Sequence, residues 1–310
     1  MPTWIIKAFL QKVISYLPYS ESINYYCQRY VTKGLNLQEA YFARKLTECQ
    51  HFYHDYGKYG KQPRQSFNVL ELGTGWHPII PIGLYLCGAE EIFTIDIVNH
   101  LRPESLKEVL VFFSDWAERG QLSKLLPIKD ETRIARLQSL AMQKNVTNPR
   151  QLLQRLNIKV VIADVCRWAG SLGRVDLIVS NDVLQHIPPQ VISDIFNTLR
   201  NMASDTSIMI HNINMIDHYS LTDKNITPFN FLQYSDNYWK IYNNSLHYQN
   251  RLRMSDYSNI HNKTGWKILS TEIMKGNIAD IDKIKLNNKF TAYPKEDLLI
   301  IRGWIVSKIK

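Results

Sequence analysis

A short apolar segment that runs into two closely spaced glycines carries the clearest chemical signal in this chain. Residues 67–72 have the pattern of a strand, Gly73 and Gly75 follow, and residues 78–87 have the pattern of a helix. A strand that leads into a glycine turn and then a helix brings bare backbone close to a nucleotide-like ligand. The glycines permit positive φ, and the helix N-terminus offers unpaired N–H groups. Residues 77–78 are His-Pro where a dinucleotide fingerprint would have its third glycine.

Polar side chains follow the next apolar segments along the chain. Asp96 ends residues 91–96, Asp164 ends residues 158–164, and Asn181 follows residues 175–180. In an open parallel sheet, ligands bind beyond the carboxyl ends of the strands, so these side chains are expected to meet at one edge. Asp96 is suited to accept hydrogen bonds from two ribose hydroxyls. The glycine turn has no Lys or Arg, which a phosphate ligand would favour, so the set indicates an adenosine ligand without phosphates.

These motifs resemble those of the class I S-adenosylmethionine-dependent methyltransferases. Leu70-Glu-Leu-Gly-Thr-Gly75 is similar to the first motif of that family, and Thr94-Ile-Asp96 is similar to the acidic end of its second strand. The segment from Asp176 to Pro188, which ends in His-Ile-Pro, is similar to its fourth motif. The resemblance covers residues 66–216 and extends more weakly to a bacterial group found near glycan and natural-product genes.

The resemblance implies S-adenosyl-L-methionine as the cofactor. The residues that it places against the cofactor are Glu71, Gly73, Thr74, Gly75, Asp96, Ile97, Asp164, Val165 and Asn181. Gly73 and Gly75 would flank the methionine part, Asp96 would take the ribose, and Asp164 with Val165 would meet the adenine. The alternative for Asp96 and Asp164 is an ordinary helix cap after a strand.

Methyl transfer needs a general base only when the acceptor is a hydroxyl or a protonated amine. The candidate bases are His186, His211, Asp217 and His218. His211 is expected to end a strand and face the cleft, with a structural histidine as the alternative. The candidate acceptor-binding residues are Tyr219, Asn230, Tyr234, Trp239, Asn250 and Arg251. Their alternative is a packed lid with its hydroxyls satisfied, and Arg251 could pair either with an anionic group or with Asp256.

Alternating strand and helix signals predict an α/β fold: a Rossmann-like, mostly parallel seven-stranded sheet with helices on both faces. The predicted strand segments are 67–72, 91–96, 158–164, 175–180, 206–213 and 298–306. Residues 1–65 are predicted to form an N-terminal helical cap that ends in a connector at 57–63. Residues 66–310 would form the methyltransferase domain, with a helical insertion at 99–157 and an acceptor-side lid at 214–255.

The chain has 310 residues, a net charge of +9 and four cysteines without metal-like pairing. The basic excess is spread over residues 1–65 and 217–310, so no dense stripe indicates nucleic-acid binding. We expect a cytoplasmic enzyme with reduced cysteines, a small-molecule acceptor such as a sugar or specialised metabolite, no nucleic-acid partner and no membrane span. The alternatives are an NAD-dependent oxidoreductase with a Rossmann domain and a basic nucleic-acid-binding protein of nucleotide fold.

Overall fold

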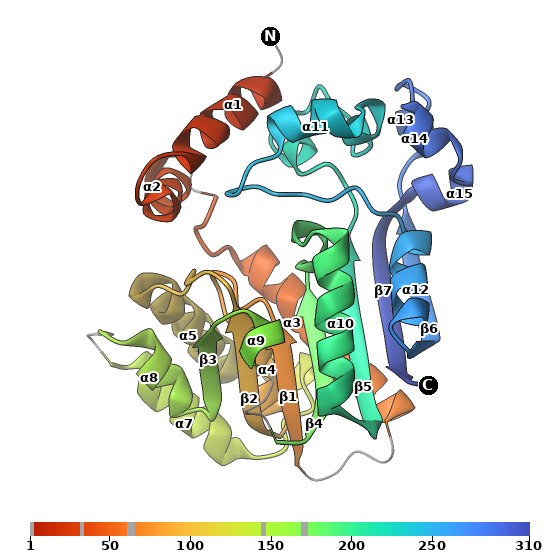
Figure 1. Ribbon diagram of the computed structural model, residues 1–310. Coiled ribbons are helices and arrows are strands. Elements are labelled where there is room, and N and C mark those ends of the chain that lie inside the picture. Colours follow the sequence, from red (N-terminus) through yellow and green to blue (C-terminus); the bar gives the residue numbers. More distant parts are fainter. Residues whose placement is uncertain (1–2, 32–33, 61–65, 144–146, 169–172) are drawn as a thin grey trace.

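A computed structural model describes residues 3–31, 34–60, 66–143, 147–168 and 173–310. A seven-stranded sheet has the order β3-β2-β1-β4-β5-β7-β6, and only β7 runs antiparallel to its neighbours (Figure 1). The strands are β1 (Phe67–Leu72), β2 (Ala89–Asp96), β3 (Ile158–Ile162), β4 (Val175–Asn181), β5 (Ala203–Asn214), β6 (Trp266–Lys275) and β7 (Ile300–Ile309). The strand order reverses between β1 and β4, which is where ligands bind in folds of this kind. The predicted Rossmann-like fold is confirmed.

Strands β1 and β4 are almost continuously apolar because both faces of the sheet are covered. Leu177 and Val179 point into one core and Ile178 into the other, as the two-residue period of a strand requires. The first core includes side chains of α3 (Glu39–Tyr59), α4 (Ile79–Leu86), α5 (Pro103–Glu118), α6 (Leu122–Leu125), α7 (Glu131–Ala141) and α8 (Pro149–Gln154). The second includes side chains of α9 (Val165–Trp168), α10 (Pro189–Met202) and α12 (Met254–Lys263).

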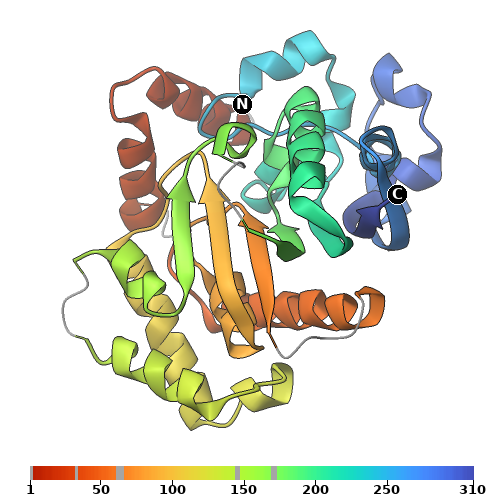
Figure 2. The ribbon, with the colours of Figure 1, turned by 60° about the horizontal axis from the view of Figure 1, so that its bottom comes forward.

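The segment predicted as a helical insertion, residues 99–157, is part of the first core. Leu110 of α5, Leu137 of α7 and Leu153 of α8 are buried in the same cluster as Val69 of β1. In Figure 1 and Figure 2, α7 and α8, in yellow-green, lie beside β3 at one side of the sheet. The segment is therefore an extended crossover between β2 and β3 that packs with the domain.

A third core lies above the sheet in Figure 1 and joins the two ends of the chain. Trp4 of α1 (Thr3–Ser15) packs there on Tyr219 and Tyr242, with ring centroids 5.5 and 4.8 Å apart. The other short elements above the sheet are α2 (Ser20–Tyr26), η1 (Cys27–Val31), η4 (His218–Leu221), η5 (Asn230–Gln233), α11 (Asp236–Tyr242), α13 (Ile278–Ile281), α14 (Asn288–Thr291) and α15 (Lys295–Leu298). The predicted cap, residues 1–65, thus divides: α1, α2 and η1 lie above the sheet, whereas α3 packs in the first core. Residues 61–63 of the predicted connector lie outside the described residues.

The strand predictions agree with the structure except near the C-terminus. Strand β6 was not predicted, because its second half is exposed and carries no buried alternation. Leu298, predicted to begin the late strand, ends α15 instead, and β7 starts at Ile300. Within the described residues, none of the helices combines the length and apolarity needed to cross a membrane.

Candidate active site

The turn after β1 adopts a backbone conformation that favours glycine at two positions. Gly73 has φ +84° and Gly75 has φ +61°. A Cβ on Gly73 would lie 2.3 Å from Cγ2 of Val183, so the turn packs directly against the segment that follows β4. A Cβ on Gly75 would meet no atom within 4 Å. One glycine therefore permits close packing inside the protein, and the other presents bare backbone to open space.

The carboxylate of Asp96 lies beside this turn. Its Oδ2 accepts a hydrogen bond from the backbone N–H of Gly75 at 3.3 Å, and its Oδ1 accepts one from Val98 at 3.1 Å. Asp96 is half-buried, whereas Ile97 is 75% exposed. The sequence predicted that the glycine turn and the end of the second strand lie together. The hydrogen bond between Gly75 and Asp96 agrees with this prediction.

Glu71 and Thr74 lie on the protein side of the turn. Thr94 Oγ1 donates to Glu71 Oε2 at 2.6 Å and is 2.8 Å from Thr74 Oγ1. Burial raises the pKa of Glu71 to about 8, although the bond from Thr94 works in the other direction. At neutral pH this carboxyl is mostly protonated. It is connected to Thr74 of the turn through the hydroxyl of Thr94.

Asp164 at the end of β3 is exposed and caps α9, since its Oδ1 accepts from the backbone N–H of Cys166 at 3.0 Å. Val165 is buried in the second core. The structure thus agrees with the alternative that Asp164 is a helix cap. The other carboxylate oxygen of Asp164, Oδ2, is 3.7 Å from Nε of Arg167. A ligand contact by Asp164 remains a proposal.

A network of charged groups lies where β4 ends. Asn181 Nδ2 donates to Glu48 Oε2 at 2.8 Å, and Asn181 Oδ1 accepts from Asn212 at 2.9 Å. Asp182, with φ +58°, accepts from Lys45 Nζ at 2.8 Å and from Arg302 Nη1 at 2.9 Å. Burial acts to raise the pKa of Asp182, but the charges of Lys45 and then Arg302 outweigh it and hold that pKa well below its usual range.

The sequence analysis did not find the partners of Asn181 and Asp182. Lys45 and Glu48 come from α3, more than 130 residues earlier, and Arg302 comes from β7. One local feature of the sequence pointed to this network: Lys45 and Glu48 form a charged pair three residues apart on the buried face of α3.

Three histidine rings meet next to this network. The centroids of His186 and His218 are 5.0 Å apart, and those of His218 and His247 are 5.8 Å apart. Burial lowers the pKa of His218 well below its usual value and lowers that of His247 to about 3. The Nε2 atoms of His218 and His247 are buried and have no hydrogen-bond partner among the described residues. Asp182 and Arg302 also act on the pKa of His218, which places the histidines beside the ion network.

His186 lies at the surface of the protein, beside His218. Its side chain is exposed, yet desolvation lowers its pKa, as expected for a ring that water reaches while protein surrounds it on several sides. The charge of His100 also acts on that pKa, and the ring of His100 is 4.5 Å from Trp76, directly after the glycine turn. The glycine turn, the end of β4 and the histidines therefore belong to one site.

Two of the candidate bases are buried in the interior. His211 in β5 is fully buried, 2.7 Å from Ser180 Oγ and stacked on Phe196 at 5.0 Å, so the prediction that it faces a cleft is wrong and the alternative of a structural histidine agrees with the structure. Asp217 is also fully buried: it caps η4 by accepting from the backbone N–H of Tyr219 at 2.9 Å and accepts from Asn230 at 2.8 Å. Burial raises the pKa of Asp217 to about 6. Both were misplaced because a sequence pattern does not tell which face of the sheet or loop a side chain takes.

The candidate acceptor-binding residues form the interior of the lid, as the packed-lid alternative predicts. They make their polar contacts within the protein: Tyr219 with Tyr242 O, Asn230 with Asp217, Trp239 with Gln249 O, Asn250 with Leu184 O and Ile187 O, and Arg251 with Phe231 O and Asp236. Tyr234 stacks on Trp239 at 6.3 Å. Arg251 thus pairs with Asp236 instead of Asp256. Asn250 ties the lid to the turn that carries His186.

Two surface cavities lie elsewhere. One, of about 590 Å³, is lined by Asn68, Glu91 and Lys159 among others and lies at the amino ends of the strands. The other, of about 560 Å³, lies between α3 and α6 and is lined by Tyr53 and Leu125 among others. Neither contains a residue of the glycine turn or the histidine cluster.

No protein-family model matches the chain, and no curated protein matches it in sequence. Among solved structures, it is similar to magnesium protoporphyrin IX methyltransferase from Synechocystis with bound SAH, at 13% identity over 86% of this chain and 82% of that one, with a TM-score of 0.44. It is also similar to an S-adenosylmethionine-dependent methyltransferase from Clostridium acetobutylicum (11% identity, 94% and 98% covered, TM-score 0.43). A third is a TehB-like methyltransferase from Corynebacterium glutamicum (10% identity, 94% and 100% covered, TM-score 0.45). Values this low do not establish the chemistry of this chain, which is inferred below from its own site.

Proposed function

We propose that this protein is an S-adenosylmethionine-dependent methyltransferase that acts on an oxygen or nitrogen of a small molecule. The observation that carries the proposal is the pairing of Gly75 with Asp96 at the point where the strand order reverses. The backbone of Gly75 faces open space there, and the carboxylate of Asp96 lies within hydrogen-bond distance of its N–H group. This is the donor and acceptor set that an adenosyl amino acid requires.

The chemistry of the turn fits that cofactor better than a phosphate-bearing one. Residues 73–78 contain no Lys or Arg and no third glycine, so nothing in the turn matches a pyrophosphate. Asp96 has two oxygens for the ribose hydroxyls, and the exposed Ile97 offers an apolar surface beside them. An NAD-dependent oxidoreductase is the weaker alternative for the same reason. The diffuse basic charge gives nucleic-acid binding no comparable support.

When bound, S-adenosylmethionine supplies an electrophilic methyl group, so the protein has to bind, orient and desolvate the acceptor. His186 is the residue placed to remove the acceptor proton. Its Nδ1 is 2.7 Å from the backbone oxygen of Tyr248, which only accepts, so Nδ1 carries the hydrogen and Nε2 keeps a free lone pair. The lowered pKa keeps the ring neutral at neutral pH, as a base requires.

We assign His218 and His247 to the acceptor side of the site, because their rings follow that of His186. Both rings are neutral at neutral pH, and each has an unpartnered Nε2 that can donate or accept according to its tautomer. Such groups suit an uncharged acceptor with several hydroxyls, such as a sugar or a hydroxylated specialised metabolite. His218 therefore remains in the site as a binding residue.

The test is calorimetric titration of the whole chain with S-adenosylmethionine, S-adenosylhomocysteine and NAD. We expect binding of the first two only, and Asp96→Ala should weaken it at least tenfold, because a charge-assisted hydrogen bond is lost. Asp205→Asn, an exposed carboxyl near the start of β5, is the matched control and should bind normally. Binding of NAD without S-adenosylmethionine would refute the proposal.

A further inference from the structure

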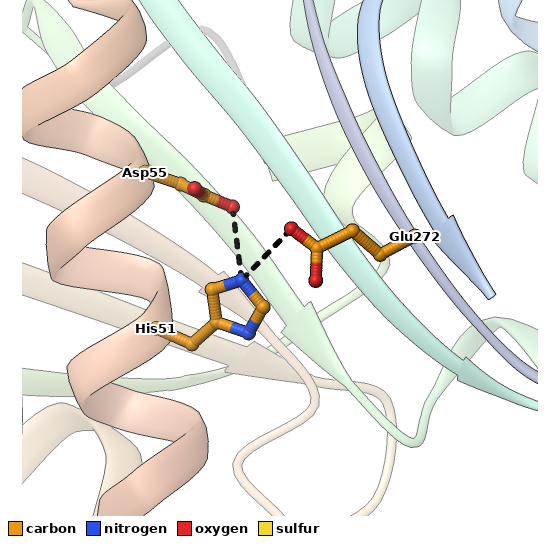
Figure 3. Close-up of side chains that lie close together, drawn as sticks. All are labelled: His51, Asp55 and Glu272. Carbon is orange, nitrogen blue, oxygen red and sulfur yellow. Dashed lines mark ion pairs between the residues drawn. The ribbon is translucent and has the colours of Figure 1, made fainter. Parts of the chain in front are cut away.

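A histidine and two carboxylates converge between α3 and β6, further along α3 than Lys45, which contacts Asp182. His51 and Asp55 lie one helical turn apart on α3, and Glu272 reaches them from β6 (Figure 3). Nε2 of His51 is 3.5 Å from Asp55 Oδ2 and 3.4 Å from Glu272 Oε1. One ligand atom from each residue lies within 4.8 Å of the other two. None of these residues has a place in the proposed methyl transfer.

The spacing fits a tetrahedral metal site better than direct hydrogen bonds. An N–H···O bond has its usual separation near about 2.9 Å, and both separations here exceed it. Zinc holds nitrogen and oxygen ligands at about 2.0–2.1 Å, so two ligands of a tetrahedron are about 3.4 Å apart. The two separations from His51 match that edge. A cation at the centre would also offset the repulsion between the carboxylates.

The ligand side chains are held in place by Trp304 of β7. The rings of His51 and Trp304 stack at 4.1 Å with an interplanar angle of 9°. The indole Nε1–H donates to Asp55 Oδ2 at 2.8 Å. Asp55 is 4% exposed, whereas His51 and Glu272 are 34% and 58% exposed, so the site is anchored on one side and open to an arriving ion on the other. Outer partners of this kind orient metal ligands.

We propose that His51, Asp55 and Glu272 bind a divalent transition-metal ion of the zinc class, with water at the fourth position. The imidazole ligand favours zinc over magnesium or calcium, which prefer oxygen ligands throughout. The ion would connect α3 to β6 and so stabilise the position of α3. The same helix supplies Lys45 and Glu48 to the network where β4 ends. The site does not depend on the proposed methyl transfer.

Calorimetric titration of the chelator-treated full chain with ZnCl₂ tests the site, together with a thermal melt. We expect one zinc per chain and a rise in Tm. His51→Ala and Glu272→Gln should each weaken binding at least tenfold, while Glu90→Gln, an exposed carboxyl elsewhere, should not. Since Glu272 is exposed, its variant is expected to fold even if His51→Ala does not. Tetrahedral cobalt absorption in the Co²⁺-loaded protein would support the geometry. Equal zinc affinity in wild type and Glu272→Gln, or no zinc binding, would overturn the proposal and leave an ion pair only.

Discussion

Nδ1 of His186 lies 2.7 Å from the backbone oxygen of Tyr248, and this contact determines which ring nitrogen carries the hydrogen. Tyr248 belongs to the segment predicted as a lid, residues 214–255, which Asn250 connects to the turn after β4 through two backbone oxygens. This segment therefore orients a histidine of the candidate site, although its own aromatic side chains pack against one another. A base whose tautomer is set in this way needs no further partner.

His186→Ala should lower kcat by about 10²–10⁴-fold, the usual contribution of a positioned general base. Binding of S-adenosylmethionine should stay within about twofold, since the side chain lies on the acceptor side. Burial lowers the pKa of His186, so the ring should become protonated, and the wild-type rate should fall, at a lower pH than for an ordinary histidine with a pKa of about 6.5.

The control for this variant is His54→Ala, because His54 is 71% exposed on α3, outside the cleft. It should leave kcat unchanged. If His186→Ala retains the wild-type rate and pH profile, catalysis proceeds by proximity alone and the assignment of a base is wrong.

Gly75→Val should abolish measurable cofactor binding. The valine would place a β-branched side chain in the open space beside the turn and would strain a backbone at φ +61°. Gly120→Val is a matched control, because Gly120 has φ +63° and equally open surroundings away from the site. Both variants should lose similar stability in a thermal melt, and only the first should lose S-adenosylhomocysteine binding by calorimetry. Equal affinity in the two variants would show that the turn does not face the cofactor.

The parts of this fold that the sequence predicted are those with a local signal. Residues 67–72 were predicted as a strand because an apolar run meets a glycine turn, and the bounds of β1 agree. Strand β6 gave no such signal, since Trp266 is its only buried side chain and its second half is exposed. Its position is determined by pairing with β7 at the edge of the sheet, which is a property of the tertiary structure.

The candidate site shows the same division. Gly75 and Asp96 were predicted to meet because both follow strands that are neighbours in a parallel sheet. The contact of Lys45 with Asp182 was beyond prediction, because a helix assigned to the cap in fact packs on the sheet. His211 was misplaced by a single choice of strand face, since every second residue of β5 points to the opposite core.

Lys45→Met should destabilise the protein by about 1–3 kcal/mol. The variant removes one of the cations that hold Asp182, and Arg302 remains, so the loss should be smaller than for a buried pair with no second partner. Urea denaturation at neutral pH measures it. Lys263→Met, an exposed lysine at the end of α12, should change the free energy of unfolding by less than about 0.5 kcal/mol. Similar losses in both variants would show that Asp182 does not depend on Lys45.

Asp182 should also contribute to the acid sensitivity of the fold. Its pKa in the folded state lies below the value of about 3.9 expected in the unfolded chain. Its stabilising effect is therefore present above about pH 4 and is lost as the pH falls through the folded-state value. Asp182→Asn should be less stable than wild type at pH 7, and the difference should shrink towards pH 2. A difference in Tm that stays constant over this range would contradict the linkage.

Glu71 should produce the opposite dependence on pH. Burial raises its pKa to about 8, above the value of about 4.3 in an unfolded chain, so the folded state favours the protonated form. This contribution is fully present below about pH 4 and is lost as the pH rises through about 8. Glu71→Gln keeps an oxygen for the bond from Thr94 and cannot ionise, so its Tm should exceed that of wild type at pH 9 and match it more closely at pH 5. Thermal melts across that range give the answer, with Glu90→Gln as an exposed control. Should Glu71→Gln lower the Tm equally at both pH values, Glu71 is ionised in the folded protein and its charge is balanced by Lys45.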